Sequence, residues 1–536
     1  MSDNRFRVIA RIGGVLLFVG IVLSLPFSGV LYAQTGAKKP ARGPGNAEQH
    51  TARAFEAARA NPPDLHAFLV RMPKGADLHY HLTGGIYAET FIRAGADDGL
   101  CVDLATLSFT KPANASQSAP PQPVCEDKKV PAAKAFSDQH LYDALIDAFS
   151  MRSFVPSPGV SGHDHFFDTF GKFGGVSDRH NGEFLDETAA RAASQNEQYL
   201  ELMQTPDFGH TATIARQLGW HDDMPKLRSD LLARGLRDDI AVASAMIDNE
   251  ESARRKIEHC GQPQDAPACK MTIRYLYQVL RGFPKEQVFA QTLLGFEVAS
   301  ADPRFVGINY VMPEDGTTSM ADYAPQMKMI GYLHGLFPKV HITLHAGELA
   351  EGLVPPDGLC CHIRLAVEDA HAERIGHGVD VMHEDRPYEL LKEMAAKHVM
   401  VEVNLTSNDV ILGVTGKDHP FPIYRKYHVP VALSTDDEGV SRIDLTHEYV
   451  RAVDTYRLSY ADLKQMVRTG LEHNFLPGAS LWREPDNFTR AVAACTPVTL
   501  GMDKPSAACS NFLKSSEKGR QQWELEHRFR EFEARF

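Results

Sequence analysis

Eight short apolar runs, each followed by a longer amphipathic stretch, recur along most of this chain and limit the folds that it can adopt. They cover residues 76–82, 199–203, 272–280, 305–312, 340–345, 374–377, 400–405 and 431–435. Buried strands that alternate with helices form parallel sheets, so eight such units predict an α/β fold, a (β/α)8 TIM barrel. The alternative, an open doubly wound sheet, would carry a Gly-rich phosphate loop after an early strand. Neither GxGxxG nor GxxxxGK[ST] occurs in the sequence.

The chain extends beyond these runs at both ends. Residues 1–33 have a basic start, an uncharged apolar stretch and small residues before Gln34, which is typical of a secretory signal peptide. Residues 12–33 are also long enough to cross a bilayer, so an uncleaved membrane anchor is the alternative. We predict a linker and an N-terminal helix at 34–70, the barrel at 71–482 and a C-terminal helical extension at 483–536. The last part of that extension, residues 521–536, is charged and is predicted to be a solvated helix.

The link between the first two runs is much longer than one barrel crossover needs. We interpret residues 96–180 as an insertion near the barrel mouth, after the first strand. Such an insertion can form a lid, a contact within a homodimer or a surface loop. For its cysteine-bracketed part, a surface loop is the commonest case.

Charge and cysteine content narrow the choice of partner and compartment. The formal net charge of −13 disfavours a nucleic-acid polymer as partner and favours a small neutral or weakly charged molecule. Cys360 and Cys361 are adjacent, and can be free thiols, a vicinal pair or partners of residues elsewhere. The other six cysteines form local pairs that suit disulfides in an oxidising compartment: Cys101 with Cys125, Cys260 with Cys269, and Cys495 with Cys509. We therefore expect an exported protein, periplasmic or secreted, that meets a membrane only if residues 1–33 remain attached.

Two histidines in the first run are placed to share a ligand. His79 and His81 are two residues apart on a strand, so both imidazoles point to the same side. That arrangement suits a metal ion, although such pairs also occur in cores and on surfaces. Later runs end in further polar clusters: His345 with Glu348, His377 between two glycines, and Asp436 with Asp437. The carboxyl ends of barrel strands meet at one face, where barrel enzymes build their sites.

These clusters together predict one metal centre. Three histidines and an aspartate can close around a single zinc ion and leave a position for water. A bound zinc lowers the pKa of that water to near neutrality, and a nearby carboxylic acid and histidine can then handle the protons. The residues therefore favour metal-assisted hydrolysis.

The same motifs resemble those of the adenosine deaminase family, in the family's order. They are Met72-Pro73-Lys74 with His79-Tyr80-His81, His345-Ala346-Gly347-Glu348, Arg374-Ile375-Gly376-His377-Gly378 and Ser434-Thr435-Asp436-Asp437. The resemblance spans residues 72–481 and is nearest to the secreted, growth-factor-like branch of the family. It implies one zinc ion per chain and a purine nucleoside as substrate. The implied reaction is deamination of adenosine, and of deoxyadenosine, to inosine and ammonia.

The resemblance also implies a role for each matching residue. Glu348 would protonate N1 of the purine, His377 would orient or deprotonate the attacking water, and Asp437 would hydrogen-bond N7. Glu402 would orient other groups, Ser407-Asn408 matches a family position, and His419-Pro420 is expected in a structural turn. The implied zinc ligands are His79, His81, His345 and Asp436, and the implied substrate contacts are His81, Thr83, Met312 and Asp437.

Two positions depart from the family pattern. Thr83 stands where the family usually has an aspartate that contacts the ribose 5′-hydroxyl. Met312 stands where a glycine usually offers its backbone N–H to purine N3. Both changes concern sugar and base contacts, so another 6-aminopurine (adenine, a 5′-modified adenosine or AMP) remains an alternative substrate. The alternative function that is not enzymatic is that of an extracellular binding protein with a vestigial barrel.

Overall fold

The computed structural model describes residues 44–114, 123–496 and 498–536. The predicted signal peptide or anchor, residues 1–33, and most of the predicted linker lie outside the described residues. Among the helices that are described, none is both long and apolar enough to cross a membrane.

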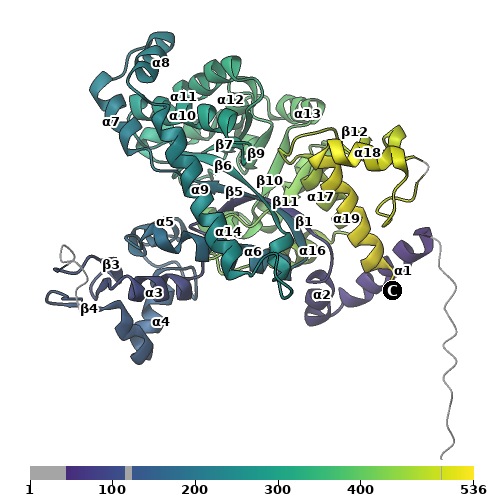
Figure 1. The fold of residues 1–536 in the computed structure, drawn as a ribbon, viewed down its shortest axis with the longest axis horizontal. Helices are drawn as coiled ribbons and strands as arrows, with labels where there is room; N and C mark the ends of the chain where they lie inside the picture. Colours follow the sequence, from purple (N-terminus) through teal and green to yellow (C-terminus); the bar gives the residue numbers. More distant parts are fainter. Residues whose placement is uncertain (1–43, 115–122, 497) are drawn as a thin grey trace, which may run out of the picture. The chain divides into compact units, whose positions relative to one another are not determined.

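Eight parallel strands form the centre of the molecule, with helices around them (Figure 1). The ring closes between its first and last strands: the Asp436 N–H donates to the His79 carbonyl over 2.9 Å, and the His81 N–H donates to the Asp436 carbonyl over 3.2 Å. The predicted TIM barrel is therefore confirmed. In pairing order the strands are β1 (Gly75–His81), β5 (Glu197–Gln204), β6 (Thr272–Leu280), β7 (Phe305–Val311), β8 (His341–Ala346), β9 (Arg374–His377), β10 (Met400–Val403) and β11 (Val431–Leu433).

Burial on both faces explains why these strands contain apolar residues at both inward and outward positions. Every residue of β1, β5, β9, β10 and β11 is buried, because the inner face fills the barrel and the outer face packs on helices. The helices are α6 (Asn181–Ser194), α7 (Gly209–Leu218), α8 (Met224–Ala233), α9 (Asp238–Ile257), α10 (Lys285–Ala301), α11 (Thr317–Leu336), α12 (His362–Glu368), α13 (Pro387–Lys397), α14 (Leu405–Leu412), α15 (Phe421–Lys426), α16 (Leu445–Tyr456) and α17 (Tyr460–Glu472).

The last two strands end two residues earlier than predicted. At the end of β10, Leu405 already begins α14. At the end of β11, the Asp77 carboxylate accepts both the backbone N–H of Thr435 (3.0 Å) and its hydroxyl (2.7 Å). A side chain thus replaces the next strand partner, and the chain turns at Asp436, whose φ is 63°. This early turn directs two consecutive aspartates into the barrel mouth.

The insertion after β1 is folded. It contains α3 (Ala88–Asp97), a small antiparallel sheet in the order β3-β2-β4, α4 (Gln139–Ala148) and α5 (Gly162–Lys172). The sheet comprises β2 (Cys101–Asp103), β3 (Ser108–Thr110) and β4 (Lys129–Pro131), and the Cys101–Cys125 disulfide begins in it. A plain surface loop is therefore wrong for the described part of this cysteine-bracketed segment.

The C-terminal helix corrects another expectation. α19 (Glu517–Glu533) is a core helix and not a solvated one, because Leu525, Phe529 and Phe532 are at most 2% exposed. Their spacing of four and three residues places them on one face of the helix. That face packs against the N-terminal helices α1 (Pro44–Ala58) and α2 (Pro62–Leu69), where Phe68 meets Phe532 edge-on. The many charges of 521–536 obscured this apolar stripe. Before α19 lie β12 (Trp482–Glu484), β13 (Asn487–Ala491) and α18 (Ala507–Ser515).

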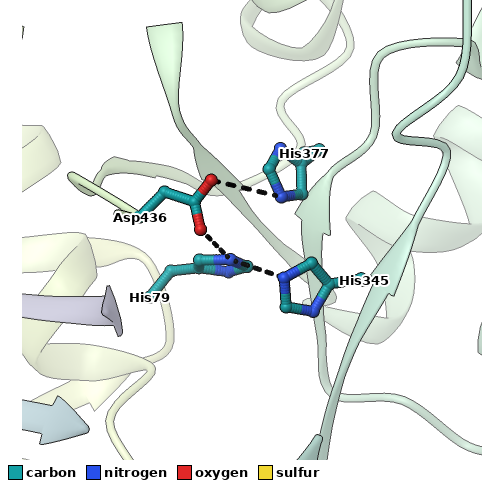
Figure 2. A group of neighbouring side chains, drawn as sticks. All are labelled: His79, His345, His377 and Asp436. Atoms are coloured by element: carbon teal, nitrogen blue, oxygen red, sulfur yellow. Dashed lines mark hydrogen bonds and ion pairs between the residues drawn. The ribbon is translucent and has the colours of Figure 1, made fainter. Parts of the chain in front are cut away.

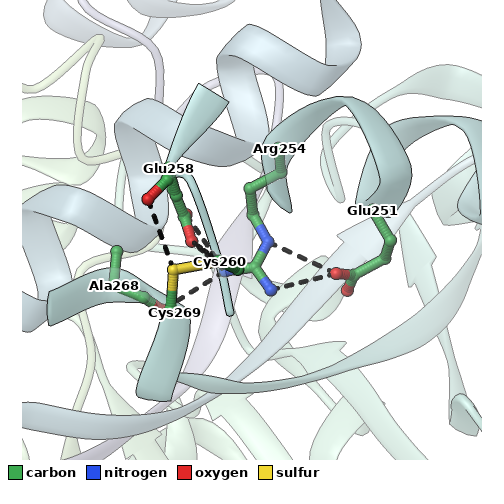
Figure 3. The surroundings of a disulfide bond; sticks show 6 residues. All are labelled: Glu251, Arg254, Glu258, Cys260, Ala268 and Cys269. Carbon is green, nitrogen blue, oxygen red and sulfur yellow. Dashed lines mark hydrogen bonds and ion pairs between the residues drawn. A yellow bond between two sulfur atoms is a disulfide. The ribbon is translucent and has the colours of Figure 1, made fainter. Parts of the chain in front are cut away.

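All eight cysteines are paired in disulfides, and the three local pairs are those expected. Cys360 and Cys361 are bonded to each other. Figure 3 shows the Cys260–Cys269 bond, which ties the end of α9 to the segment before β6. Beside it Arg254 is buried, pairs with Glu251 and Glu258, and donates to the Ala268 carbonyl over 3.3 Å. The disulfide thus holds the partners of a buried cation in place.

Removal of the Cys260–Cys269 bond by the double change Cys260→Ser and Cys269→Ser should lower the free energy of unfolding by about 2–3 kcal/mol. The closed loop is short (sequence separation 9), so most of the effect comes from greater freedom of the unfolded chain. Urea unfolding followed by circular dichroism measures it. Under reducing conditions the free energy of unfolding of the wild type should fall at least as much. An unchanged urea midpoint, in the double variant and in the reduced wild type, would contradict a stabilising role for the disulfide.

Candidate metal centre

Five buried side chains converge where the barrel strands end. His79 and His81 come from β1, His345 from β8, His377 from β9, and Asp436 from the turn after β11. Figure 2 shows four of them, with the imidazoles of His79, His345 and His377 around the Asp436 carboxylate. The parallel strands of the barrel bring these residues together although up to 357 positions separate them along the chain.

Four of these residues place one atom each so that four of the six distances between them match those of a tetrahedral site. His345 Nε2 lies 3.1 Å from His79 Nε2 and 3.1 Å from His81 Nε2. Asp436 Oδ1 lies 3.3 Å from His79 Nε2 and 3.2 Å from His81 Nε2. A tetrahedral zinc with bonds of about 2.0–2.1 Å separates its ligand atoms by roughly 3.3 Å. The three imidazoles and the carboxylate therefore fit one such ion.

The outer nitrogens of the three histidines determine which atoms face the centre. Each Nδ1 lies at hydrogen-bond distance from a side-chain oxygen: His79 from Glu402 (2.6 Å), His81 from Gln278 (2.6 Å) and His345 from Asn309 (2.8 Å). Because each Nδ1 donates to an oxygen, each neutral ring presents the lone pair of Nε2 inward. Asp436 Oδ1 is buried and has no hydrogen-bond partner among the described residues. Three lone pairs and a carboxylate oxygen so close together call for a cation between them.

His377 lies beside this set. One nitrogen of His377 falls within 4.8 Å of ligand atoms from His79, His345 and Asp436, so it is an alternative to His81. Its Nε2 is 4.0 Å from the other oxygen of Asp436 and 3.7 Å from Glu348 Oε1. The shorter distances to His81 favour His81 as the fourth ligand and leave His377 facing the space next to it.

Glu348 is fixed beside the centre by its own backbone. Glu314, a buried carboxylate, accepts the N–H of Gly347 (3.0 Å) and that of Glu348 (2.8 Å). Gly347 has φ of 74°, and a Cβ there would lie 2.4 Å from Asp380 Oδ1, so only glycine fits this turn. Burial raises the pKa of the Glu348 carboxyl well above its ordinary value, and the nearby charges of Asp436 and Glu314 raise it further. Glu348 is thus suited to hold a proton at neutral pH.

Asp437 is buried next to Asp436, in the turn after β11. Its Oδ1 has no hydrogen-bond partner among the described residues. A Cβ on Gly84 would lie 1.5 Å from this oxygen, so the glycine leaves the room that the carboxyl occupies. Burial, and then the charge of Asp436, raise the pKa of Asp437 to about 7. Near neutral pH this carboxyl can either donate or accept a hydrogen bond.

A cavity of about 1490 Å³ opens from the centre. Thr83 and Met312 line it, together with Glu348 and Asp437, so the predicted substrate contacts share one space. Met312 has φ of 94°, and its sulfur accepts the N–H of Gly282 over 3.3 Å, which turns the side chain towards the end of β6. The outer wall comes from α5 of the insertion, through Phe166, Phe167 and Phe170.

Several residues of the site were not recognised from the sequence. Gln278, Asn309 and Glu314 hold His81, His345 and the Glu348 loop, and His419 lies near His377. Asn408 was recognised only as a match to a family position, and the structure places it between His419 and His377. A signal existed for two of them, since Gln278 and Asn309 are polar residues near the ends of otherwise apolar strands. His419 was expected only in a structural turn, and Glu402, expected to orient other groups, contacts His79, Thr343 and Arg374.

Known proteins with similar sequences include adenosine deaminases. The family model of adenosine deaminase matches residues 185–481. An adenosine deaminase of Clostridium perfringens (strain 13 / Type A) is 36% identical over 135 residues, which cover 25% of this chain and 37% of that protein. One of Shewanella loihica is 35% identical over 136 residues, 25% of this chain and 38% of that protein. The matched stretch thus spans little more than a third of these relatives.

Solved structures with a similar fold include two deaminases. An adenine deaminase from Arthrobacter aurescens has a TM-score of 0.48 and 16% identity, over 76% of this chain and 94% of its own. An Arabidopsis N6-mAMP deaminase has a TM-score of 0.49 and 20% identity, over 77% of this chain and 96% of its own. The family model itself spans more than half of the chain, and the chain belongs to the adenosine deaminase family.

Proposed function

We propose that this protein is a hydrolytic deaminase that uses one zinc ion per chain to convert adenosine, and deoxyadenosine, to inosine and ammonia. Family membership supports deaminase chemistry. The observation that carries the proposal is that His345 Nε2 and Asp436 Oδ1 each lie 3.1–3.3 Å from the Nε2 atoms of His79 and His81, beside the buried Glu348, whose pKa is raised by burial.

The proposed ligands are His79, His81, His345 and Asp436, and their donor set of three nitrogens and one oxygen suits zinc. Bound there, zinc supplies a Lewis acid that lowers the pKa of water to near neutrality. Glu402, Gln278 and Asn309 fix the imidazoles that would hold it. Ser407 donates to the outer oxygen of Asp436 over 2.7 Å and so leaves the inner oxygen as ligand.

The remaining side chains of the site divide the reaction between them. Glu348 donates its proton to N1 of the purine, which makes C6 electrophilic. The oxygen of water then bonds to C6, beside His377, and the water gives up both protons: one returns to Glu348, and the other reaches the amino nitrogen, whose bond to C6 then breaks. Asp437, protonated in part near pH 7, donates a hydrogen bond to N7. The products are the 6-oxopurine nucleoside and ammonia.

The charges that line the cavity favour a nucleoside over a nucleotide. A phosphate monoester carries nearly two negative charges and is usually held by Arg or Lys. Arg179 is the lone Arg or Lys among the described side chains that line the cavity, and it pairs with Asp98 at 2.6 Å. Asp178, Asp207 and Glu250 add carboxylates to the same wall. A second candidate, an adenosine with a neutral 5′ extension, is favoured by the size of the cavity.

We also propose that the protein is exported. The three local disulfides and the Cys360–Cys361 bond support an oxidising compartment, since disulfides persist there. The signal-like residues 1–33 support the same placement. Fractionation of cells that express the full chain, with N-terminal sequencing of the product, tests both export and cleavage.

Ammonia release across adenosine, deoxyadenosine, adenine, AMP and 5′-modified adenosines tests the substrate. We expect turnover of adenosine and deoxyadenosine, and kcat/KM for AMP lower by about 100-fold or more, because a phosphate enters a wall of carboxylates without a free cation. The unsubstituted 5′-deoxyadenosine serves as the control for the sugar contact. A preference for AMP would overturn the nucleoside proposal, and no ammonia from any 6-aminopurine would overturn deamination.

A further inference from the structure

A buried chain of polar groups runs behind His377. The backbone N–H of Phe421, at the start of α15, lies 3.1 Å from His419 Nδ1. His419 Nε2 lies 2.9 Å from Asn408 Oδ1, and Asn408 Nδ2 lies 2.9 Å from His377 Nδ1. The three side chains are at most 2% exposed, so water does not compete for these contacts.

The direction of every hydrogen bond in this chain follows from its first member. A backbone N–H can only donate, so His419 Nδ1 accepts and carries no proton. The proton of the neutral ring is then on Nε2, which donates to Asn408 Oδ1; burial lowers the pKa of His419 to about 4, consistent with a neutral ring. The amide of Asn408 cannot be turned over, because its NH₂ would then face the N–H of His419. Asn408 therefore donates to His377 Nδ1, and the proton of His377 is on Nε2.

The surroundings of His377 Nε2 agree with a proton there. The atoms around it are mainly acceptors: Glu348 Oε1 at 3.7 Å and Asp436 Oδ2 at 4.0 Å. The amide of Asn404 lies 3.5 Å away, and its Oδ1 has no partner among the described residues, so a half-turn of this amide would point an acceptor at Nε2. These distances are too long for direct hydrogen bonds, and a water oxygen to one side of them can bond to Nε2 and to the carboxylates.

We propose that His419 and Asn408 are positioning residues that hold His377 in the Nε2–H tautomer. His377 then donates a hydrogen bond to the attacking oxygen and does not remove its proton. The inference rests on the proposed function for the identity of that oxygen, but the tautomer itself does not depend on it. It also decides between the two roles, orienting and deprotonating, that the family pattern leaves open for this histidine.

The tautomer is measured directly by ¹⁵N NMR of protein labelled at histidine, with the His377 signals identified from their loss in His377→Gln. We expect a protonated Nε2 and an unprotonated Nδ1. His419→Glu places an acceptor against Asn408 Oδ1, which should turn the amide over and move the proton of His377 to Nδ1. His419→Gln keeps an N–H donor and should keep the wild-type pattern. An unprotonated His377 Nε2 in the wild type would overturn the proposal that His419 and Asn408 set its tautomer.

Turnover tests the donor role with the same pair of variants. His419→Glu should lower kcat on the order of 100-fold, the usual effect of losing one donor to a reacting oxygen, with KM within about two-fold and zinc content unchanged. His419→Gln should restore most of the loss. His140→Glu, an added charge on the exposed surface of α4, controls for charge alone.

Asn408→Asp provides a second route if the His419→Glu protein does not fold. In its ionised form the aspartate can only accept, so it should also draw the His377 proton to Nδ1 and lower kcat. Equal or higher kcat in the acceptor variants overturns the donor role. If the wild type releases no ammonia from any 6-aminopurine, the proposed function fails, while the NMR pattern still decides the tautomer.

Discussion

Glu348→Gln should lower kcat by about three orders of magnitude while zinc binding and fold remain normal. The amide keeps the shape of the carboxyl, and the Glu314 contacts that hold residues 347 and 348 involve only backbone N–H groups. Glutamine, however, cannot transfer a proton to N1, and general acids of this kind contribute about 10²–10⁴ to rate. Stopped or continuous ammonia assays give kcat, and metal analysis gives the zinc content.

Glu351→Gln is the matched control for this change. Its side chain is 81% exposed and lies three residues further along the chain, so the same loss of charge should leave kcat near that of the wild type. Retention of more than about a tenth of wild-type turnover in Glu348→Gln would remove the assigned role of this residue as the acid.

Removal of the metal should abolish turnover and weaken the fold. Without a cation, His345 Nε2 and Asp436 Oδ1 each lie 3.1–3.3 Å from the Nε2 atoms of His79 and His81, so this buried site must take up protons in place of the ion. Binding to the native state alone stabilises it by RT ln(1 + [L]/Kd), about 4 kcal/mol when free zinc is 1,000 times Kd. We therefore expect dialysis against a strong chelator to lower both Tm and kcat, and added zinc to restore both.

Calcium, added to the metal-free protein in place of zinc, is the appropriate control. It prefers six to eight oxygen ligands and should not restore turnover at this nitrogen-rich site. Glu402→Gln should ease the extraction of zinc, because the partners of metal-bound histidines contribute about 10–100-fold to affinity. A protein that loses no activity after complete chelation would rule out the metal centre.

The barrel could be predicted because each strand carries its own signal. Buried parallel strands are continuously apolar, and β6 and β9 have the bounds expected from their sequences. The end of β10 could not be predicted because α14 already begins at Leu405, and that of β11 because a distant carboxylate, Asp77, accepts the backbone N–H of Thr435. Such long-range contacts leave no mark on the local pattern of residues.

In the candidate site, too, some residues could be predicted from the local sequence and others could not. His79 and His81 were predictable from alternation along one strand, and Glu348 from its position after His345. Asn408 matched a family position, but its role and that of His419 could not be predicted, because an amide and an imidazole acquire their roles only through the direction in which each donates. The three-dimensional arrangement, and the backbone N–H at its start, assign those directions.

The last helix has a consequence for how the chain matures on the ribosome. Lys464 contacts Glu48 of α1 (2.9 Å) and Glu533 of α19 (2.6 Å), and Phe68 of α2 meets Phe532. The helices α1 and α2 therefore cannot complete their packing until α19 has been synthesised. A premature stop codon ahead of α19 would leave the apolar faces of α1 and α2 uncovered and expose the product to proteolysis. Among the described residues, the packing of α1 and α2 thus depends on a helix that is made much later.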